Sequence, residues 1–245
     1  MKMNCEYAFK FIFIGEKGCG KTWLVRSWCG LRQVNDVDTN KCVVIDSYKK
    51  IVEEEFTGTR IMIHINDSSG DISYRPILRR YLPIHTCVII VYDVDCRKSF
   101  DRLSYWFQIA KEEATSNQVH YMIVGVGKRP KHQSTFMAVS TEDIENWIKM
   151  VDTKATHMTH FQVFTDTAQI IDDEFNELIS EIFTDVQRNR YNSLTKAGIT
   201  CIRSFDMDKP RLVLAPSPPT ARRRDLSCCC EKNDKEPCIK FCSLL

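Results

Sequence analysis

The sequence has little net charge, little glycine or proline, and no long hydrophobic run. Its 245 residues carry a formal net charge of +2 with 9 glycines and 8 prolines. This composition excludes a collagen-like chain, a wholly disordered chain and a strongly nucleic-acid-binding chain, so no nucleic-acid partner is expected. No apolar run approaches the roughly 20 residues of a membrane-spanning helix, so any membrane attachment is expected to be peripheral. The amino terminus has no basic stretch followed by an apolar segment, which predicts a protein that is not secreted and stays in a reducing compartment.

Apolar periodicity continues through most of the chain and then stops. From about Thr200 the sequence becomes rich in Pro, Arg and Cys. We therefore expect one domain over residues 1–192 and a flexible, disordered C-terminal tail over residues 193–245. Cysteines crowd the end of this tail, and a reducing compartment requires an explanation for them other than disulfide bonds.

Strand and helix patterns alternate along the expected domain. Aromatic and β-branched runs predict strands at residues 7–14, 45–56, 59–66, 86–92, 121–126 and 161–164, the second and third forming a hairpin. Apolar residues at helical spacing predict helices at residues 22–30, 99–114, 140–151 and 171–186, the third opened by a Ser140 and Asp143 capping box. This alternation predicts an α/β fold with a mostly parallel six-stranded sheet, helices on both faces, and ligands outside the carboxyl ends of the strands.

The strongest motif follows the first expected strand directly. It fits the phosphate-loop pattern G-x-x-x-x-G-K-[ST] in full and consists of Gly15, Glu16, Lys17, Gly18, Cys19, Gly20, Lys21 and Thr22. Glycines let successive backbone NH groups curl around a phosphate, and the amino end of the following helix adds positive potential. Lys21 is expected to supply charge to the terminal phosphates, and the Thr22 hydroxyl to ligate Mg²⁺.

A second motif, Asp67-Ser68-Ser69-Gly70, stands at the end of the strand expected at residues 59–66. Asp67 is placed to reach the magnesium ion, and Gly70 offers a backbone NH where a γ-phosphate would lie. Such a contact exists only in the triphosphate state, which is how a switch loop becomes ordered. Taken alone, the four residues also fit an ordinary Asp-Ser turn that caps a strand.

With these motifs the chain resembles the Ras superfamily of small GTPases, and within it the Rab family, over roughly residues 7–190. Val91-Tyr92-Asp93, with Ser99, Phe100 and Trp106 after it, is similar to the family's fourth strand and third helix. Residues 75–81 are similar to its second switch region, and Thr167, Ala168 and Gln169 to the stretch that packs on guanine. The resemblance implies a P-loop NTPase that binds GTP and GDP with Mg²⁺ and meets effector, exchange-factor and GTPase-activating proteins.

Two positions near the expected γ-phosphate depart from this family. Asp71 stands where the family has the glutamine that orients the attacking water. A carboxylate there is repelled by the γ-phosphate and lacks the amide's donor, so we expect slow GTP hydrolysis, with Lys21 as the remaining catalytic residue. Lys17 occupies a loop position that is small in relatives, where it would either disturb access by an arginine finger or partly replace one.

The expected guanine pocket departs further. The family reads guanine with N-K-x-D, whereas residues 126–130 read Val-Gly-Lys-Arg-Pro, and neither register restores the Asn or the Asp. Lys128 is expected to lie over the base as the motif lysine does, but the base edge loses its acceptor, which weakens discrimination. For the switch threonine that ligates Mg²⁺, the spacing leaves Thr39, Asn40 and Cys42 as alternatives, of which we prefer Thr39.

The tail ends in Cys242-Ser243-Leu244-Leu245, which fits the C-a-a-X prenylation box, and the last Leu favours a geranylgeranyl chain. One lipid gives only marginal attachment. Residues 222–224, all Arg, and palmitoylation of Cys228, Cys229 and Cys230 are candidate second signals. A zinc site made of these cysteines is disfavoured because no C-x-x-C pair is present. We therefore expect a substrate of a prenyltransferase, anchored by lipid to the cytoplasmic face of an intracellular or plasma membrane.

Two functions fit this sequence. The preferred one is a membrane-anchored GTP-binding switch of Rab type that regulates vesicle trafficking or membrane-associated signalling, with slow GTP hydrolysis. The alternative is a pseudo-GTPase scaffold that keeps the fold and the anchor but binds nucleotide weakly or without selectivity. A P-loop kinase of small molecules is disfavoured because no lid-like Arg cluster follows the core.

Overall fold

The computed structural model describes residues 5–31, 44–114, 119–128, 138–151, 158–188 and 200–201. All of them lie in the first of two compact units, Met1–Phe205, and the second unit is Asp206–Leu245. Among the described residues, no helix is both long enough and apolar enough to cross a bilayer.

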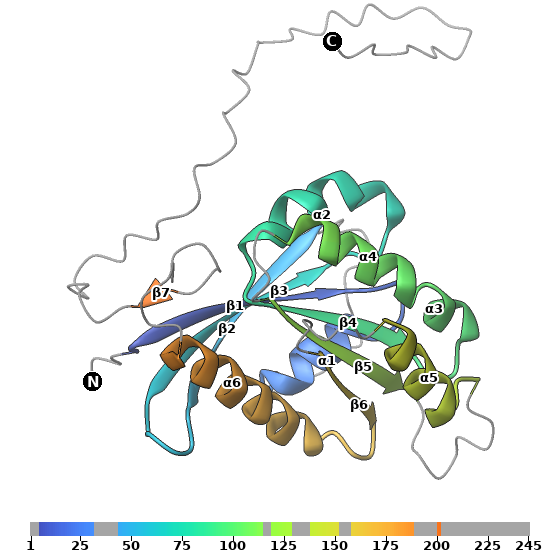
Figure 1. Cartoon of the computed structure of the whole chain (residues 1–245). Coiled ribbons are helices and arrows are strands. Elements are labelled where there is room, and N and C mark those ends of the chain that lie inside the picture. Colours follow the sequence, from blue (N-terminus) through green and yellow to red (C-terminus); the bar gives the residue numbers. More distant parts are fainter. Residues whose placement is uncertain are drawn as a thin grey trace, which may run out of the picture. The chain divides into compact units, whose positions relative to one another are not determined.

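One sheet organises the domain. Its main path runs β2-β3-β1-β4-β5-β6, in which only the β2–β3 pair is antiparallel (Figure 1). The strands are β1 (Tyr7–Ile14), β2 (Ile45–Glu53), β3 (Arg60–Ser68), β4 (Cys87–Asp93), β5 (His120–Gly127) and β6 (Met158–Phe164). The prediction of a mostly parallel six-stranded sheet with a hairpin at its start is confirmed. A seventh strand, β7 (Thr200–Cys201), pairs antiparallel with Tyr7 and Ala8 of β1 and was not predicted.

Helices cover both faces of the sheet, as predicted (Figure 1). They are α1 (Lys21–Trp28), α2 (Arg75–Tyr81), α3 (Arg97–Asp101), α4 (Leu103–Glu113), α5 (Thr141–Val151) and α6 (Ile170–Arg188), with 3₁₀ turns η1 (Ile72–Tyr74) and η2 (Leu82–Ile84) on either side of α2. The apolar stripes of α1 and α6 form one core cluster with one face of the sheet, in which Trp28 stacks on Phe175 at 4.0 Å between ring centroids. α2, α4 and α5 form a second cluster with the other face.

Several element boundaries differ from the prediction by a few residues. The helix expected at residues 99–114 is divided into α3 and α4 by a turn at Arg102, whose backbone (φ −85°, ψ −4°) stays in the right-handed region. β6 begins at Met158 rather than at Phe161, because it pairs with β5 from Tyr121 onward. Pairing with a neighbouring strand is a tertiary effect that local sequence does not contain.

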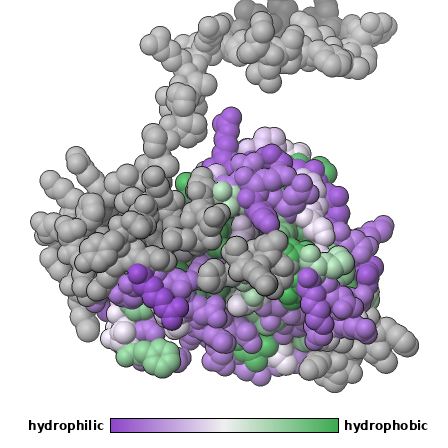
Figure 2. Space-filling view, viewed as in Figure 1, coloured by the Kyte–Doolittle hydropathy of each residue, from purple (hydrophilic) through white to green (hydrophobic). Residues whose placement is uncertain are grey.

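Most large apolar side chains of the described residues are buried. Figure 2 shows a mainly hydrophilic exterior on the visible face, with hydrophobic residues in separate patches. The exposed large apolar side chains are Leu31, Phe56, Ile72, Ile77, Tyr81 and Met150. Three of these six belong to the segment formed by η1 and α2, so this segment presents apolar groups to solvent.

The parallel strands bring several loops to one edge. β1, β3, β4, β5 and β6 all run in the same direction, so their carboxyl ends lie together. The segments that follow them are residues 15–20, 69–71, 94–96, 128 and 165–169. This edge is where an open α/β sheet binds ligands.

Candidate functional site

The loop between β1 and α1 has a tightly curled backbone that depends on its glycines. Gly15 and Gly20 have φ values of 142° and 102°, which residues with a Cβ rarely adopt. A Cβ on Gly15 would also lie 2.3 Å from the carbonyl oxygen of Val91, and one on Gly20 would lie 2.7 Å from Cγ1 of Val126. The loop therefore curls tightly over the ends of β4 and β5, with the amino end of α1 directly behind it.

Lys21 lies at the start of α1 and is buried. Its ammonium donates to the carbonyl oxygens of Gly15, at 3.0 Å, and Glu16, at 2.7 Å. The thiol of Cys19 lies 3.8 Å from the same nitrogen, and burial raises the pKa of this thiol, so it stays neutral. A buried ammonium inside a loop of this shape is suited to holding phosphate oxygens.

Thr22 and Asp67 meet across the site. The Thr22 hydroxyl donates to Oδ2 of Asp67 at 2.5 Å. Asp67 is buried, and burial raises its pKa to about 6. Its other oxygen, Oδ1, is buried and has no hydrogen-bond partner among the described residues. Mg²⁺ prefers oxygen ligands, so a buried carboxylate oxygen that accepts no hydrogen bond, next to a hydroxyl oxygen, fits this ion. The expected third ligand, Thr39, lies outside the described residues.

The loop after β3 packs directly on the phosphate loop. A Cβ on Gly70 would lie 2.4 Å from the carbonyl carbon of Glu16 and 2.4 Å from the backbone nitrogen of Lys17. The Ser68 hydroxyl donates to the carbonyl oxygen of Phe13 at 2.6 Å and fixes the end of β3 on β1. Gly70 therefore lies against the phosphate loop, and only a residue without a side chain allows this approach.

Asp71 serves as the cap of a 3₁₀ turn. Asp71 is half-exposed, and its side chain accepts hydrogen bonds from the backbone NH of Ser73 at 2.9 Å and from the Ser73 hydroxyl at 2.7 Å. These two bonds lower the pKa of Asp71, so the carboxylate is ionised near neutral pH. The charged group that replaces the family's glutamine is thus engaged in local structure.

The end of β5 has an arrangement that the motif alone did not reveal. Val126 lies against Gly20, and a Cβ on Gly127 would lie 2.1 Å from Cδ1 of Phe164, its partner on β6. Lys128, which we expected over the base, forms an ion pair with the buried Asp93 at 2.6 Å between Nζ and Oδ2. The ammonium is therefore directed to the end of β4.

The stretch of Thr167, Ala168 and Gln169 forms a turn before α6. The Thr167 hydroxyl accepts from the backbone NH of Phe164 at 3.0 Å, and the Thr167 NH donates to the Phe164 carbonyl at 3.0 Å. Ala168 packs on the core cluster beneath α1 and α6, whereas Gln169 is exposed. The turn is held by its own backbone and lies at the same edge as the phosphate loop.

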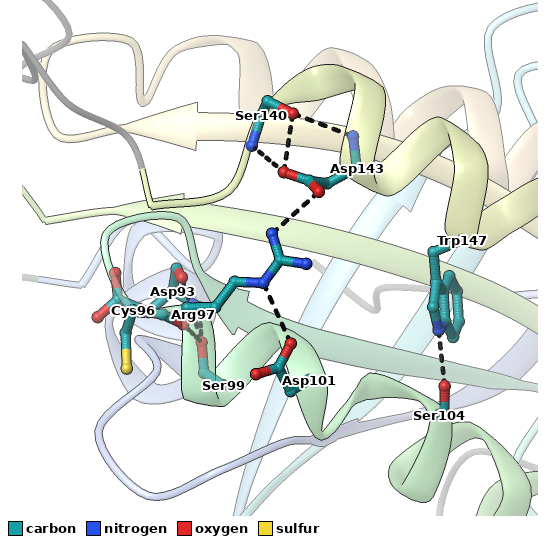
Figure 3. Close-up of polar contacts among 9 residues, drawn as sticks. All are labelled: Asp93, Cys96, Arg97, Ser99, Asp101, Ser104, Ser140, Asp143 and Trp147. Carbon is teal, nitrogen blue, oxygen red and sulfur yellow. Dashed lines mark hydrogen bonds and ion pairs between the residues drawn. The ribbon is translucent and has the colours of Figure 1, made fainter.

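Charged residues after β4 form a network that sequence reasoning missed. Arg97 lies between Asp101, at 3.1 Å, and Asp143, at 2.9 Å (Figure 3). Hydrogen bonds from Ser140 and then the Arg97 guanidinium lower the pKa of Asp143 to about 2. The Ser140 and Asp143 capping box is confirmed, but its link to a residue 46 positions earlier has no signal in the local sequence.

A second missed contact involves the phosphate loop itself. Oε1 of Glu16 accepts from Arg102 Nε and from Trp106 Nε1, each at 3.1 Å. Trp106 is buried in the core, as its helical spacing predicted, yet its indole nitrogen reaches the loop. The charge of Glu16 was the only local signal, and it does not identify a partner.

Several expected site residues fall outside the described part of the chain. They are Thr39 and the lipidation residues Cys228, Cys229, Cys230 and Cys242.

Comparisons with known proteins agree with this geometry. The family model described as the Ras family matches residues 10–184. The chain is 28% identical over 201 residues to the Ras-related protein Rab-8B of Pongo abelii, which covers 81% of this chain and 89% of the relative. It is also 28% identical over 123 residues to the Ras-related protein Rab-42 of Mus musculus, covering 50% of this chain and 57% of the relative.

Proposed function

The chain belongs to the Ras family as a Rab-type small GTPase, and we propose that it works as a membrane-anchored switch with slow GTP hydrolysis. In its GTP form it would bind effectors that act in vesicle trafficking or in signalling at a membrane. Exchange factors and GTPase-activating proteins would set the balance between its GTP and GDP forms.

One observation carries this proposal: the phosphate loop and the Thr22–Asp67 pair form a coherent site for a magnesium–phosphate group. Lys21 is buried with its ammonium inside the loop, and Asp67 has a buried oxygen that lacks a donor. Mg²⁺ bound there would neutralise phosphate charge, and Thr22 and Asp67 would hold it. Gly70 is close enough to the loop to offer its NH to a γ-phosphate.

Slow hydrolysis follows from Asp71. Its carboxylate is ionised and hydrogen-bonded to Ser73, so it offers no donor to an attacking water and would repel the γ-phosphate. An acidic neighbour destabilises a transition state that gains negative charge. GTP hydrolysis would therefore be faster with a GTPase-activating protein that supplies a positive charge than in the chain alone.

Membrane attachment would come from the tail. Cys242 in the sequence Cys-Ser-Leu-Leu would receive a geranylgeranyl group from a prenyltransferase. Because one lipid binds a bilayer only marginally, palmitoyl groups on Cys228, Cys229 and Cys230, or the three arginines at 222–224, would provide the second signal.

The alternative, a pseudo-GTPase scaffold, is favoured by one specific observation at the base side. Lys128 is ion-paired with Asp93, and Val126 and Gly127 provide no side-chain hydrogen-bond acceptor for a base edge. A site built this way would hold a nucleotide by its phosphates. It would discriminate between GTP and ATP by less than about tenfold, because it has no buried acceptor that pairs with guanine and would be left unpaired with adenine.

The nucleotide released from the purified full chain tests the proposal. We expect guanine nucleotide to co-purify, Mg²⁺ with GTP to raise the melting temperature, and Lys21→Ala to abolish both effects. Lys149→Ala, which changes an exposed lysine on α5 outside the site, is the matched control and should retain nucleotide. A folded protein without nucleotide and without a thermal shift would contradict the switch and favour the scaffold.

A further inference from the structure

α2 packs on α4. Leu78 at its centre and Leu82 just after it are buried in the same apolar cluster as Leu103 and Phe107 of α4. α2 begins five residues after Gly70, in the second switch region of the proposed GTPase. Such a region is ordinarily ordered by contacts with a γ-phosphate and is released when that phosphate is lost. The contacts that hold α2 in this chain are therefore informative.

The first turn of α2 is held by an aromatic ring. The guanidinium carbon of Arg75 lies 4.2 Å from the ring centroid of Tyr105 on α4. Nε of Arg75 is buried and has no hydrogen-bond partner among the described residues, so at this nitrogen no hydrogen bond supplements the contact with the ring. A guanidinium over an aromatic face is attracted by the ring's quadrupole, and more strongly when water is excluded.

The ring of Tyr105 is also contacted by Arg102, the residue just before α4. The guanidinium carbon of Arg102 lies 4.3 Å from the Tyr105 centroid, and its Nε donates to Glu16 of the phosphate loop at 3.1 Å. The carbonyl oxygen of Glu16 in turn accepts from Lys21 at 2.7 Å. Tyr105 is thus held by a residue that is itself tied to the rigid base of the nucleotide site.

The last turn of α2 is held less firmly. Arg79 pairs with Glu112 at 3.4 Å and with Glu113 at 3.1 Å. The side chains of Arg79 and Glu112 are each 47% exposed, and exposed ion pairs contribute little to stability. The contact between Arg75 and Tyr105 is therefore the polar interaction that most restricts α2.

None of these contacts involves a phosphate. We propose that Tyr105 is a positioning residue that keeps α2 folded on α4 in the GDP-bound and nucleotide-free protein. α2 then presents Ile77 and Tyr81, both exposed, whether or not a γ-phosphate is bound. The proposal rests on the proposed function only in calling this segment a switch region, because the contacts themselves need no nucleotide.

Hydrogen–deuterium exchange of the peptide covering residues 72–84 tests this in the full chain, first without nucleotide and then with GDP. We expect Tyr105→Leu to accelerate exchange of this peptide at least tenfold in both states. Tyr105→Phe keeps the ring and should behave like the parent protein. Lys111→Met removes another cation–ring contact of α4, that of Lys111 with Phe107, and should leave the peptide unchanged.

A second readout separates a local effect from general loosening. Trp28 lies in the core cluster on the other face of the sheet, stacked on Phe175, so its ¹⁵N indole resonance reports on the rest of the domain and should not move in Tyr105→Leu. If Tyr105→Leu does not fold, Arg75→Met removes the same contact from the α2 side and is expected to give the same acceleration.

The proposal is overturned if residues 72–84 of the parent protein exchange as fast as an unfolded peptide, or if neither Tyr105→Leu nor Arg75→Met accelerates them. Failure to bind any nucleotide would overturn the proposed function instead. The comparison of nucleotide-free proteins would still decide the role of Tyr105.

Discussion

The Thr22 hydroxyl and Oδ2 of Asp67 lie 2.5 Å apart although 45 positions separate them in the chain. Thr22 is the second residue of α1, and Asp67 is near the end of β3. β1 and β3 are paired in parallel register, so the loop after one and the end of the other meet. This pairing brings into direct contact the two groups that would hold a magnesium ion.

Asp67 predicts how stability depends on pH. Burial raises its pKa to about 6 from an ordinary value of 3.8, so the folded chain binds more protons than the unfolded chain between these values. The free energy of unfolding of the nucleotide-free protein should therefore fall as pH rises through about 4 to 6, by an amount on the order of 3 kcal/mol from this group. Urea unfolding across this range measures the slope. Asp67→Asn should remove it, and an unchanged slope in that variant would refute the assignment.

Asp71→Gln should restore faster GTP hydrolysis. The substitution removes a charge that repels the γ-phosphate and supplies an amide donor, which predicts an increase on the order of tenfold in the single-turnover rate. Asp71→Ala removes the charge without adding the donor and should give a smaller increase. Phosphate release from GTP-loaded protein measures both rates. Equal rates in the two variants would show that the amide has no role here.

Gly127→Ala should destabilise the domain. Its new Cβ would lie 2.1 Å from Cδ1 of the buried Phe164, and overpacking of this kind costs about 1–3 kcal/mol. Phe164→Leu in the same chain should recover part of the loss, because the smaller side chain leaves room. A double-mutant cycle from thermal or urea unfolding measures this coupling. Strictly additive effects would contradict the contact.

Cys242→Ser should abolish labelling by a geranylgeranyl analogue and release the protein from membranes. The reason is that thioether formation needs the cysteine thiol, and a second signal alone binds a bilayer weakly. Fractionation of cells that express the full chain measures the membrane-bound share. Cys238→Ser, which changes a tail cysteine outside the box, is the control. Membrane binding that persists in Cys242→Ser would show that the upstream cysteines provide the anchor.

Local sequence was enough for most of the architecture. Continuous apolar runs such as residues 121–126 are typical of strands covered on both faces, as in a parallel sheet, and the alternation of strands and helices indicated the α/β order. The early start of β6 depends on its pairing with β5, and the turn at Arg102 has no signal in the helical pattern of residues 99–114. The strand β7 could not be anticipated, because two residues carry no periodicity.

The sequence by itself determined the phosphate loop, because glycine, lysine and threonine at fixed spacing between a strand and a helix leave little freedom in what the backbone can do. It also determined that Asp71 and residues 126–130 depart from the family pattern. Tertiary structure alone decided the partners: Lys128 with Asp93, Glu16 with Arg102 and Trp106, and Arg75 with Tyr105. Charged and aromatic side chains can pair with many neighbours, and only the packing of distant elements selects one.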